Sequence, residues 1–192
     1  MDNKYNTLVV NLFAGSSSGK SSNAYIIAGL LKMRGIEGEY VSEWVKDSCF
    51  EGRNNIFKLQ PYIFAKQLKK LYYINKETRV IICDSPILLS AIYDPQQNIN
   101  LRNYILETFN SCNNYNIFLN RGEIEFSKVG RNDSNLEEQN NFDIKLKNFL
   151  NENKIPYVEE VNEKGYNQLE NCKRIVEDII SRLVVNKIYD TM

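Results

Sequence analysis

The chain has 192 residues, of which 43% are hydrophobic and 25% charged, and this is the composition of an ordinary soluble globular domain. Its 24 Lys and Arg residues balance its 24 Asp and Glu residues, which argues against a protein that holds duplex DNA mainly through phosphate contacts. The sequence has no histidine, so the commonest general base and the commonest transition-metal ligand are both missing.

The first part of the chain alternates strand-like and helix-like segments. Residues 8–13 are a short apolar run, rich in strand formers, that ends at a Gly/Ser cluster. Residues 20–33 carry apolar side chains at helical spacing, and Gly35 ends that helix. Residues 39–42 predict a second strand, and the next helix begins at Gln60-Pro61 because proline suits the first helical turn.

The second part of the chain continues the alternation. An unbroken apolar run at residues 79–84 ends on Asp84 and is typical of a central parallel strand buried on both faces. A polar, Gly-containing loop is expected at residues 121–133, and Ser134 with Glu137 would then begin a helix through a capping box. The remaining predicted elements are a helix at 100–110, a strand at 115–119, the capped helix as far as about residue 150, a strand at 155–160 and a helix at 168–185.

This alternation predicts one α/β domain over residues 1–192, with a mostly parallel sheet of about five strands flanked by helices. No apolar run approaches the roughly 18 residues of a membrane span, and no signal peptide is visible. The four cysteines have no zinc-site or redox-dithiol spacing, and we expect reduced thiols in a cytoplasmic protein. They are Cys49, Cys83, Cys112 and Cys172.

Residues 14–21, Ala-Gly-Ser-Ser-Ser-Gly-Lys-Ser, match the phosphate-loop pattern G-x-x-x-x-G-K-S/T except for Ala14. The predicted strand before them and the predicted helix after them are the context that this loop requires. Lys20 would reach the β- and γ-phosphates of ATP, and the Ser21 hydroxyl would bind Mg²⁺. A serine-rich turn that happens to contain Gly-Lys-Ser is the alternative. The expected nucleotide-binding residues are Gly15, Ser16, Ser17, Ser18, Gly19, Lys20, Ser21 and Ser22.

Asp84 is the second element of the predicted site. An acid at the carboxyl end of a buried parallel strand lies beside the phosphate loop in this architecture, where ligands gather. Asp84 can therefore hold Mg²⁺, directly or through water. The alternative is an aspartate that only forms an Asp-Ser-Pro turn after the strand.

Several stretches in this order carry a resemblance to a known family: residues 11–13 with the phosphate loop, residues 39–47, residues 60–67 and Asp84-Ser85-Pro86. Over about residues 11–157 the chain resembles small phage and bacterial P-loop proteins of the AAA type. That family is similar in turn to nicotinamide riboside kinases and to nucleoside and nucleotide kinases. The resemblance implies a kinase-like P-loop NTPase fold with a lid loop. A ring-forming motor is not expected, because little sequence is left for the extra helical domain of motor ATPases.

The kinase-like fold assigns roles to residues around the acceptor. Glu43 follows the second strand and is the best candidate to accept a proton from the acceptor hydroxyl or to orient it, unless it is simply a solvated carboxylate. Trp44 could stack on a substrate ring, although a lone tryptophan near a strand end is more often core. Gln67 could read a base edge, although a helical glutamine usually faces water. Arg53 could contact a phosphate on the acceptor.

Basic residues of the polar loop after the fourth strand are the candidate lid residues. Arg131 is preferred, Arg121 comes second and Lys128 is weaker, because the arginine side chain suits bidentate contact with phosphate. Scattered surface charges are the alternative for each of them.

The predicted function is ATP- and Mg²⁺-dependent phosphoryl transfer to a small acceptor: a nucleoside, a nucleotide or a nicotinamide-riboside-like molecule. One alternative is a kinase acting on a modified base in phage DNA, for which Lys66, Lys69 and Lys70 are the only hint. Another is an ATPase or nucleotide switch that acts on a protein partner. The sequence is compatible with a homodimer, and no membrane partner is expected.

Overall fold

The computed structural model describes residues 6–45, 51, 54–74, 78–122 and 136–190. Five strands form one sheet in the order β2-β3-β1-β4-β5, and every pairing is parallel. Their bounds are β1 Leu8–Phe13, β2 Gly38–Val41, β3 Val80–Cys83, β4 Asn113–Arg121 and β5 Val158–Asn162. This sheet confirms the predicted α/β fold.

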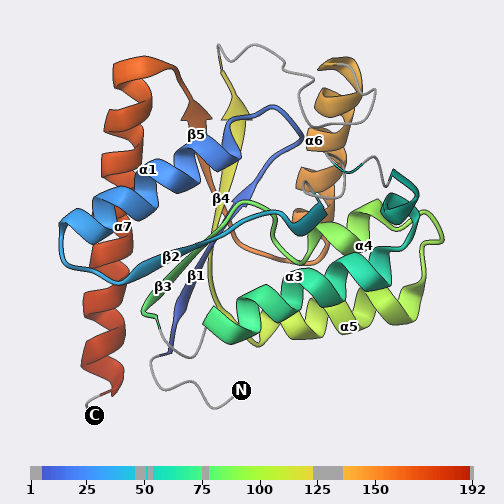
Figure 1. Ribbon diagram of the computed structural model, residues 1–192, viewed down its shortest axis with the longest axis horizontal. Coiled ribbons are helices and arrows are strands. Elements are labelled where there is room, and N and C mark those ends of the chain that lie inside the picture. Colours follow the sequence, from blue (N-terminus) through green and yellow to red (C-terminus); the bar gives the residue numbers. More distant parts are fainter. Residues whose placement is uncertain (1–5, 46–50, 52–53, 75–77, 123–135, 191–192) are drawn as a thin grey trace.

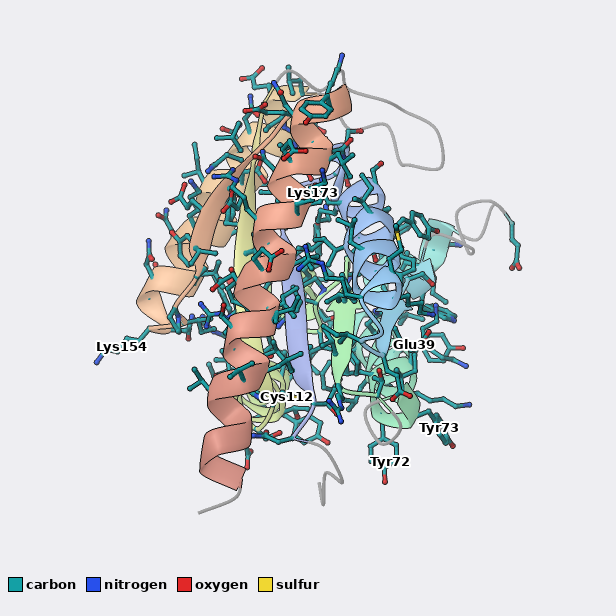
Figure 2. The ribbon with its side chains drawn as sticks, turned by 90° about the vertical axis from the view of Figure 1, so that its left-hand side faces the viewer. Glu39, Tyr72, Tyr73, Cys112, Lys154 and Lys173 are labelled. Carbon is teal, nitrogen blue, oxygen red and sulfur yellow. The ribbon has the colours of Figure 1, made fainter. Side chains whose placement is uncertain are left out.

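Helices cover both faces of the sheet. They are α1 Lys20–Met33, the 3-10 helix η1 Asn54–Lys58, α3 Gln60–Ile74, α4 Leu89–Tyr93, α5 Ile99–Asn110, α6 Leu136–Glu152 and α7 Gly165–Asp190. In Figure 1, α1 and α7 lie on one side of the strands, and α3, α4, α5 and α6 lie on the other. Figure 2 looks from the first side and shows α7 and α1 in front of the sheet. Among the described residues, no helix is both long and apolar enough to cross a membrane.

The central strand β1 is buried on both faces, and apart from Asn11 its residues are apolar. Alternate side chains point to opposite faces of a strand. Leu8, Val10 and Leu12 therefore join the core under α1 and α7, whereas Val9 and Phe13 join the core under α3, α5 and α6. All six residues of β1 are buried, so both faces of this strand need side chains suited to the interior.

The structure corrects several predicted boundaries. β4 continues to Arg121, so Arg121 belongs to a strand and not to the loop after it. β5 begins at Val158 rather than residue 155, and the proline at 156 lacks the N–H that a paired strand position uses. α7 starts three residues earlier than predicted, and the short helices η1 and α4 were not predicted. Ser134 lies outside the described residues, so its predicted capping role remains a prediction.

Candidate active site

The phosphate loop lies between β1 and α1, at the carboxyl end of the central strand. Ser17 and Gly19 have positive φ values of 59° and 77°, which turn the loop so that α1 can begin at Lys20. Gly19 is the N-cap of α1 and has no side chain with which to cap the helix. The N–H groups at the start of a helix suit an anion, and the helix dipole favours negative charge there.

The Lys20 side chain, which is expected to bind phosphate, lies against the phosphate loop. Its ammonium nitrogen Nζ donates to the carbonyl oxygens of Ala14, at 2.8 Å, and Gly15, at 2.7 Å. These contacts keep the positive charge beside the loop. Lys20 also lines the cavity described below, together with Ser16–Ser22.

A chain of buried amides holds the loop from the side of β5 and α7. The side-chain nitrogen of Asn162, the last residue of β5, donates to the carbonyl oxygen of Ser18. Asn23 donates to the Asn162 side-chain oxygen at 2.8 Å and to the Gly19 carbonyl at 3.0 Å. The Cys172 thiol completes the chain, 3.1 Å from the side-chain oxygen of Asn23, and burial raises the pKa of that thiol to about 12.

Helix α6 holds the other side of the loop. The Gly15 N–H donates to the carboxylate of Asp143, and the Ser16 N–H donates to Oε1 of Gln139 at 2.6 Å. A Cβ at position 15 would lie 2.9 Å from Oε1 of Gln139 and 3.1 Å from its backbone oxygen. Gly15 is therefore needed for the close approach of α6, which the sequence pattern did not reveal.

Arg121 does not lie in a lid. It ends β4, and its guanidinium donates to the Ser16 carbonyl at 2.9 Å and lies 3.4 Å from the carboxylate of Asp143. These contacts tie β4, the loop and α6 together, so Arg121 supports the loop from beside it. The other candidate lid residues, Arg131 and Lys128, lie outside the described residues.

Asp84 follows β3 and is 3% exposed. Its Oδ2 accepts hydrogen bonds from the Ser21 hydroxyl at 2.5 Å and from the Tyr40 hydroxyl at 2.6 Å. Its other oxygen, Oδ1, is buried and has no hydrogen-bond partner among the described residues. Burial, and then the bond to Asp84, raises the pKa of Tyr40 above its usual range, so its hydroxyl stays protonated and remains a donor.

The Asp84–Ser21 pair fits Mg²⁺. The donors are a carboxylate and a hydroxyl, which are the oxygen ligands that this ion prefers, and a buried carboxylate oxygen is left over for it. No group of three or more Asp, Glu, Cys or His among the described residues could hold a metal alone. Mg²⁺ commonly binds through one or two protein ligands and completes its shell with phosphate oxygens and water.

One cavity of about 510 Å³ joins the phosphate loop to the region under α3 and α4. At one end it is lined by loop residues and Asp84, and at the other by Glu43 and the amides of Gln60 and Gln67. Apolar side chains, among them Phe57, Ile63, Ile87 and Leu89, line the same end. The cavity therefore brings the predicted residues Lys20, Ser21, Asp84, Glu43 and Gln67 to one space.

Gln67 and Trp44, two of the predicted substrate residues, both lie beside β2 but in different surroundings. Gln67 does not face water: it is 3% exposed, accepts from the Trp44 backbone N–H at 3.1 Å and donates to the Ser42 carbonyl at 3.4 Å. The Trp44 ring packs edge-on against Tyr62 at 5.3 Å, with the Lys66 ammonium over it. Trp44 is not among the residues that line the cavity, and Arg53 lies outside the described residues.

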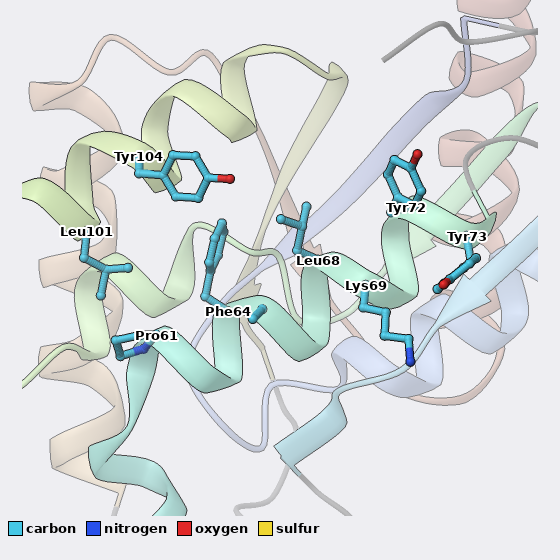
Figure 3. Close-up of a pocket in the computed structure, with 9 residues that line it drawn as sticks. Pro61, Phe64, Leu68, Lys69, Tyr72, Tyr73, Leu101 and Tyr104 are labelled. Carbon is cyan, nitrogen blue, oxygen red and sulfur yellow. The ribbon is translucent and has the colours of Figure 1, made fainter.

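A second cavity, of about 530 Å³, lies between α3 and α5 (Figure 3). Phe64 and Leu68 from α3 and Leu101 and Tyr104 from α5 point into it. No residue of the phosphate loop is among its described lining residues, and the lining is mainly apolar. The phosphate loop and Asp84 therefore line the first cavity and not the second.

Structures of known proteins resemble this chain weakly. Deoxyadenosine kinase from M. mycoides with bound dATP is 20% identical, with 91% of this chain and 98% of that chain covered and a TM-score of 0.49. An APS kinase of Mycobacterium tuberculosis is 13% identical, with 89% and 96% covered and a TM-score of 0.45. A gluconokinase from Sinorhizobium meliloti 1021 is 15% identical, with 92% and 96% covered and a TM-score of 0.36. At these values we draw nothing about substrate from them.

The sequence of this chain matches a known protein family. No curated protein matches the chain. The AAA domain family matches residues 9–167, a span that includes the phosphate loop, Asp84, β1 from its second residue and the other four strands. With its phosphate loop in place between β1 and α1, the chain belongs to the AAA domain family of P-loop proteins.

Proposed function

We propose that this protein is an ATP-dependent kinase that phosphorylates a hydroxyl group of a small acceptor. The observation that carries the proposal is the continuity of one cavity from the phosphate loop to a pocket containing a carboxylate, amides and apolar side chains. A nucleotide switch that acts on a protein needs no such pocket beside its phosphates. A kinase needs one, because the acceptor must lie in line with the transferred phosphoryl group.

The loop end of the cavity supplies charge and position for ATP. The N–H groups at the start of α1 and the Lys20 ammonium would bind the phosphates. Ser21 and Asp84 would hold Mg²⁺, which neutralises charge on the β- and γ-phosphates. Contacts from β5 and α6 fix the loop before nucleotide arrives, so these groups need little rearrangement during transfer.

The other part of the cavity lining would receive the acceptor. Glu43 is the carboxylate that this part of the lining supplies. Phe57, Ile63 and Leu89 offer apolar surface for a ring.

The reaction we propose is an in-line displacement. The acceptor hydroxyl oxygen forms a bond to the γ-phosphorus, the bond from that phosphorus to the bridging oxygen of ADP breaks, and the hydroxyl proton passes to Glu43. Glu43 thereby acts as general base, which requires no histidine. We also propose that Arg131 and Lys128 help to close the site over the transferring group, and that the protein acts in the cytoplasm.

A labelling experiment tests this proposal. The protein is incubated with Mg²⁺ and γ-labelled ATP against ribo- and deoxynucleosides, their monophosphates, nicotinamide riboside and single-stranded DNA. We expect label in one small acceptor. We expect it to fall by at least about 100-fold in Lys20→Ala, because a fixed charge on the phosphates is lost. Lys32→Ala, on the same helix but exposed at the far end from the loop, is the matched control and should keep full activity.

The other outcomes have distinct meanings. Label that appears only as free phosphate would contradict the kinase and favour an ATPase that acts on a protein. Label in DNA would favour the base kinase. Label in a nucleoside monophosphate would keep the kinase and name a nucleotide as its acceptor.

A further inference from the structure

Three side chains from three elements meet at the carboxylate of Asp84. Ser21 comes from the first turn of α1 and Tyr40 from β2, and Asp84 follows β3. In the parallel register, Tyr40 pairs with Ile82, two residues before Asp84 on the neighbouring strand. Side chains two residues apart on a strand point to the same face, so the Tyr40 phenol reaches along that face to the carboxylate.

Both hydroxyl groups bind the same carboxylate oxygen. Oδ2 of Asp84 accepts from Ser21 at 2.5 Å and from Tyr40 at 2.6 Å. A carboxylate oxygen has two lone pairs, so these two donors satisfy Oδ2. Oδ1 is buried and lacks a hydrogen-bond partner among the described residues, and a buried oxygen of this kind is costly unless something binds it.

We propose that Tyr40 is a positioning residue for the metal ion of the nucleotide. Its hydroxyl fixes the rotation of the Asp84 carboxylate so that Oδ1 is the oxygen offered to Mg²⁺. The inference rests on the proposed binding of Mg²⁺·ATP, but not on the identity of an acceptor. Tyr40 belongs to neither the phosphate-loop motif nor the motif of an aspartate at a strand end, so this role is additional to both.

Ser21 cannot fix the carboxylate alone. When the Ser21 oxygen binds the metal, the same hydroxyl must also donate its proton to Asp84. The position of Ser21 then depends on the ion, so its hydrogen bond cannot hold the Asp84 carboxylate in a fixed orientation. The Tyr40 hydroxyl is independent of the metal, and its ring is held against Tyr25 with centroids 4.6 Å apart. Tyr40 therefore supplies a fixed second contact of the kind that orients carboxylate ligands in metal sites.

The test is the Mg²⁺ dependence of ATP binding, measured by titration calorimetry without any acceptor. The variant Tyr40→Phe keeps the ring and removes only the hydroxyl. We expect the Mg²⁺ concentration for half-maximal tightening of ATP binding to rise about 10-fold, as is usual when a partner of a metal ligand is lost. Affinity for ATP in EDTA should stay the same, since the phosphate loop is unchanged.

Tyr25→Phe is the matched control, because it lies in the same ring contact but its side chain is largely exposed. It should leave the Mg²⁺ midpoint unchanged. Tyr40→Gln, which keeps a donor on a shorter side chain, is a second variant that should shift the midpoint in the same direction as Tyr40→Phe. Thermal melting of each variant confirms that it is folded before binding is measured.

Three outcomes would overturn the proposal: an unchanged midpoint in Tyr40→Phe, an equal loss of affinity with and without Mg²⁺, or a wild-type protein whose ATP binding ignores Mg²⁺. The third outcome would also remove the metal from the proposed function. Failure to find an acceptor would leave this test unaffected, because binding is measured without one.

Discussion

Asn162 gives the sharpest test of how the phosphate loop is held in place. This residue is 2% exposed, donates to the Ser18 carbonyl and accepts from Asn23 at 2.8 Å. In Asn162→Ala both bonds are lost, and the Ser18 carbonyl loses this partner in a buried setting. An unsatisfied buried polar group costs about 1–3 kcal/mol, and with the second lost bond we expect the free energy of unfolding to fall by about 2–4 kcal/mol.

The loss should appear both in stability and in binding. For a chain of this size, such a change lowers the melting temperature by about 5–15 °C. ATP affinity should also fall by about 10-fold, or 1.4 kcal/mol, because the loop must then be ordered when phosphate binds. Circular dichroism during heating gives the first quantity, and titration calorimetry with Mg²⁺·ATP gives the second.

Asn171→Ala is the matched control for Asn162→Ala. Asn171 also donates its side-chain amide to a carbonyl of β5, that of Val161 at 2.8 Å, but it does so in an exposed position. We expect a loss below about 0.5 kcal/mol and no change in ATP affinity. Equal effects of the two substitutions, or an Asn162→Ala variant as stable as wild type, would refute the idea that the buried amide chain holds the loop.

Two further predictions concern Gly15 and the buried thiols. Gly15→Ala should weaken ATP binding about 10-fold and lower the free energy of unfolding by about 1–3 kcal/mol, because the new Cβ would meet the backbone oxygen of Gln139 at 3.1 Å. Gly29→Ala is the control in the same calorimetric measurement, because its Cβ would meet nothing within 4 Å. An equal effect of the two substitutions would contradict the reasoning. Burial raises the pKa of Cys83 and Cys172 to about 12, above the ordinary value of 9.0, so the unfolded chain loses these protons first as pH rises. Their contribution to stability is therefore complete below about pH 9 and disappears between about pH 9 and 12. Urea unfolding at several pH values should show this decline, and it should be shallower in Cys172→Ala; an identical slope would show that the thiol is not responsible.

The parts of the site that the sequence predicted are those encoded locally. The phosphate loop, the strand before it and the helix after it lie within 26 residues of one another, from Leu8 to Met33. Asp84 was predictable because it ends an apolar strand, and in parallel sheets strand ends meet at one edge. In both cases the position of the side chain follows from its own segment and from the general rules of the fold.

The supporting residues were not predictable because their partners are distant in sequence. Asn23 and Asn162 are 139 residues apart, and Gly15 and Asp143 are 128 apart. Asp143 and Gln139 lie on an amphipathic helix whose other polar residues face solvent, and nothing in the chain distinguishes them from those residues. Arg121 was assigned to a lid because its polar neighbours suggested a loop, whereas pairing with β5 extends the strand as far as that residue.

The supporting contacts change how the phosphate loop is understood. The N–H groups of Gly15 and Ser16 already bind side chains of α6, and the Ser16 and Ser18 carbonyls already bind Arg121 and Asn162. These bonds fix the first half of the loop, and Gly19, the N-cap of α1 after it, has no side chain with which to cap the helix. We therefore expect phosphate to be bound by the second half of the loop and by Lys20. In a loop arranged in this way the hydrogen-bond donors are ordered when the protein folds, and not when ATP binds. Less of the binding free energy is then used to order the loop, so we expect tighter ATP binding and better stabilisation of the transition state.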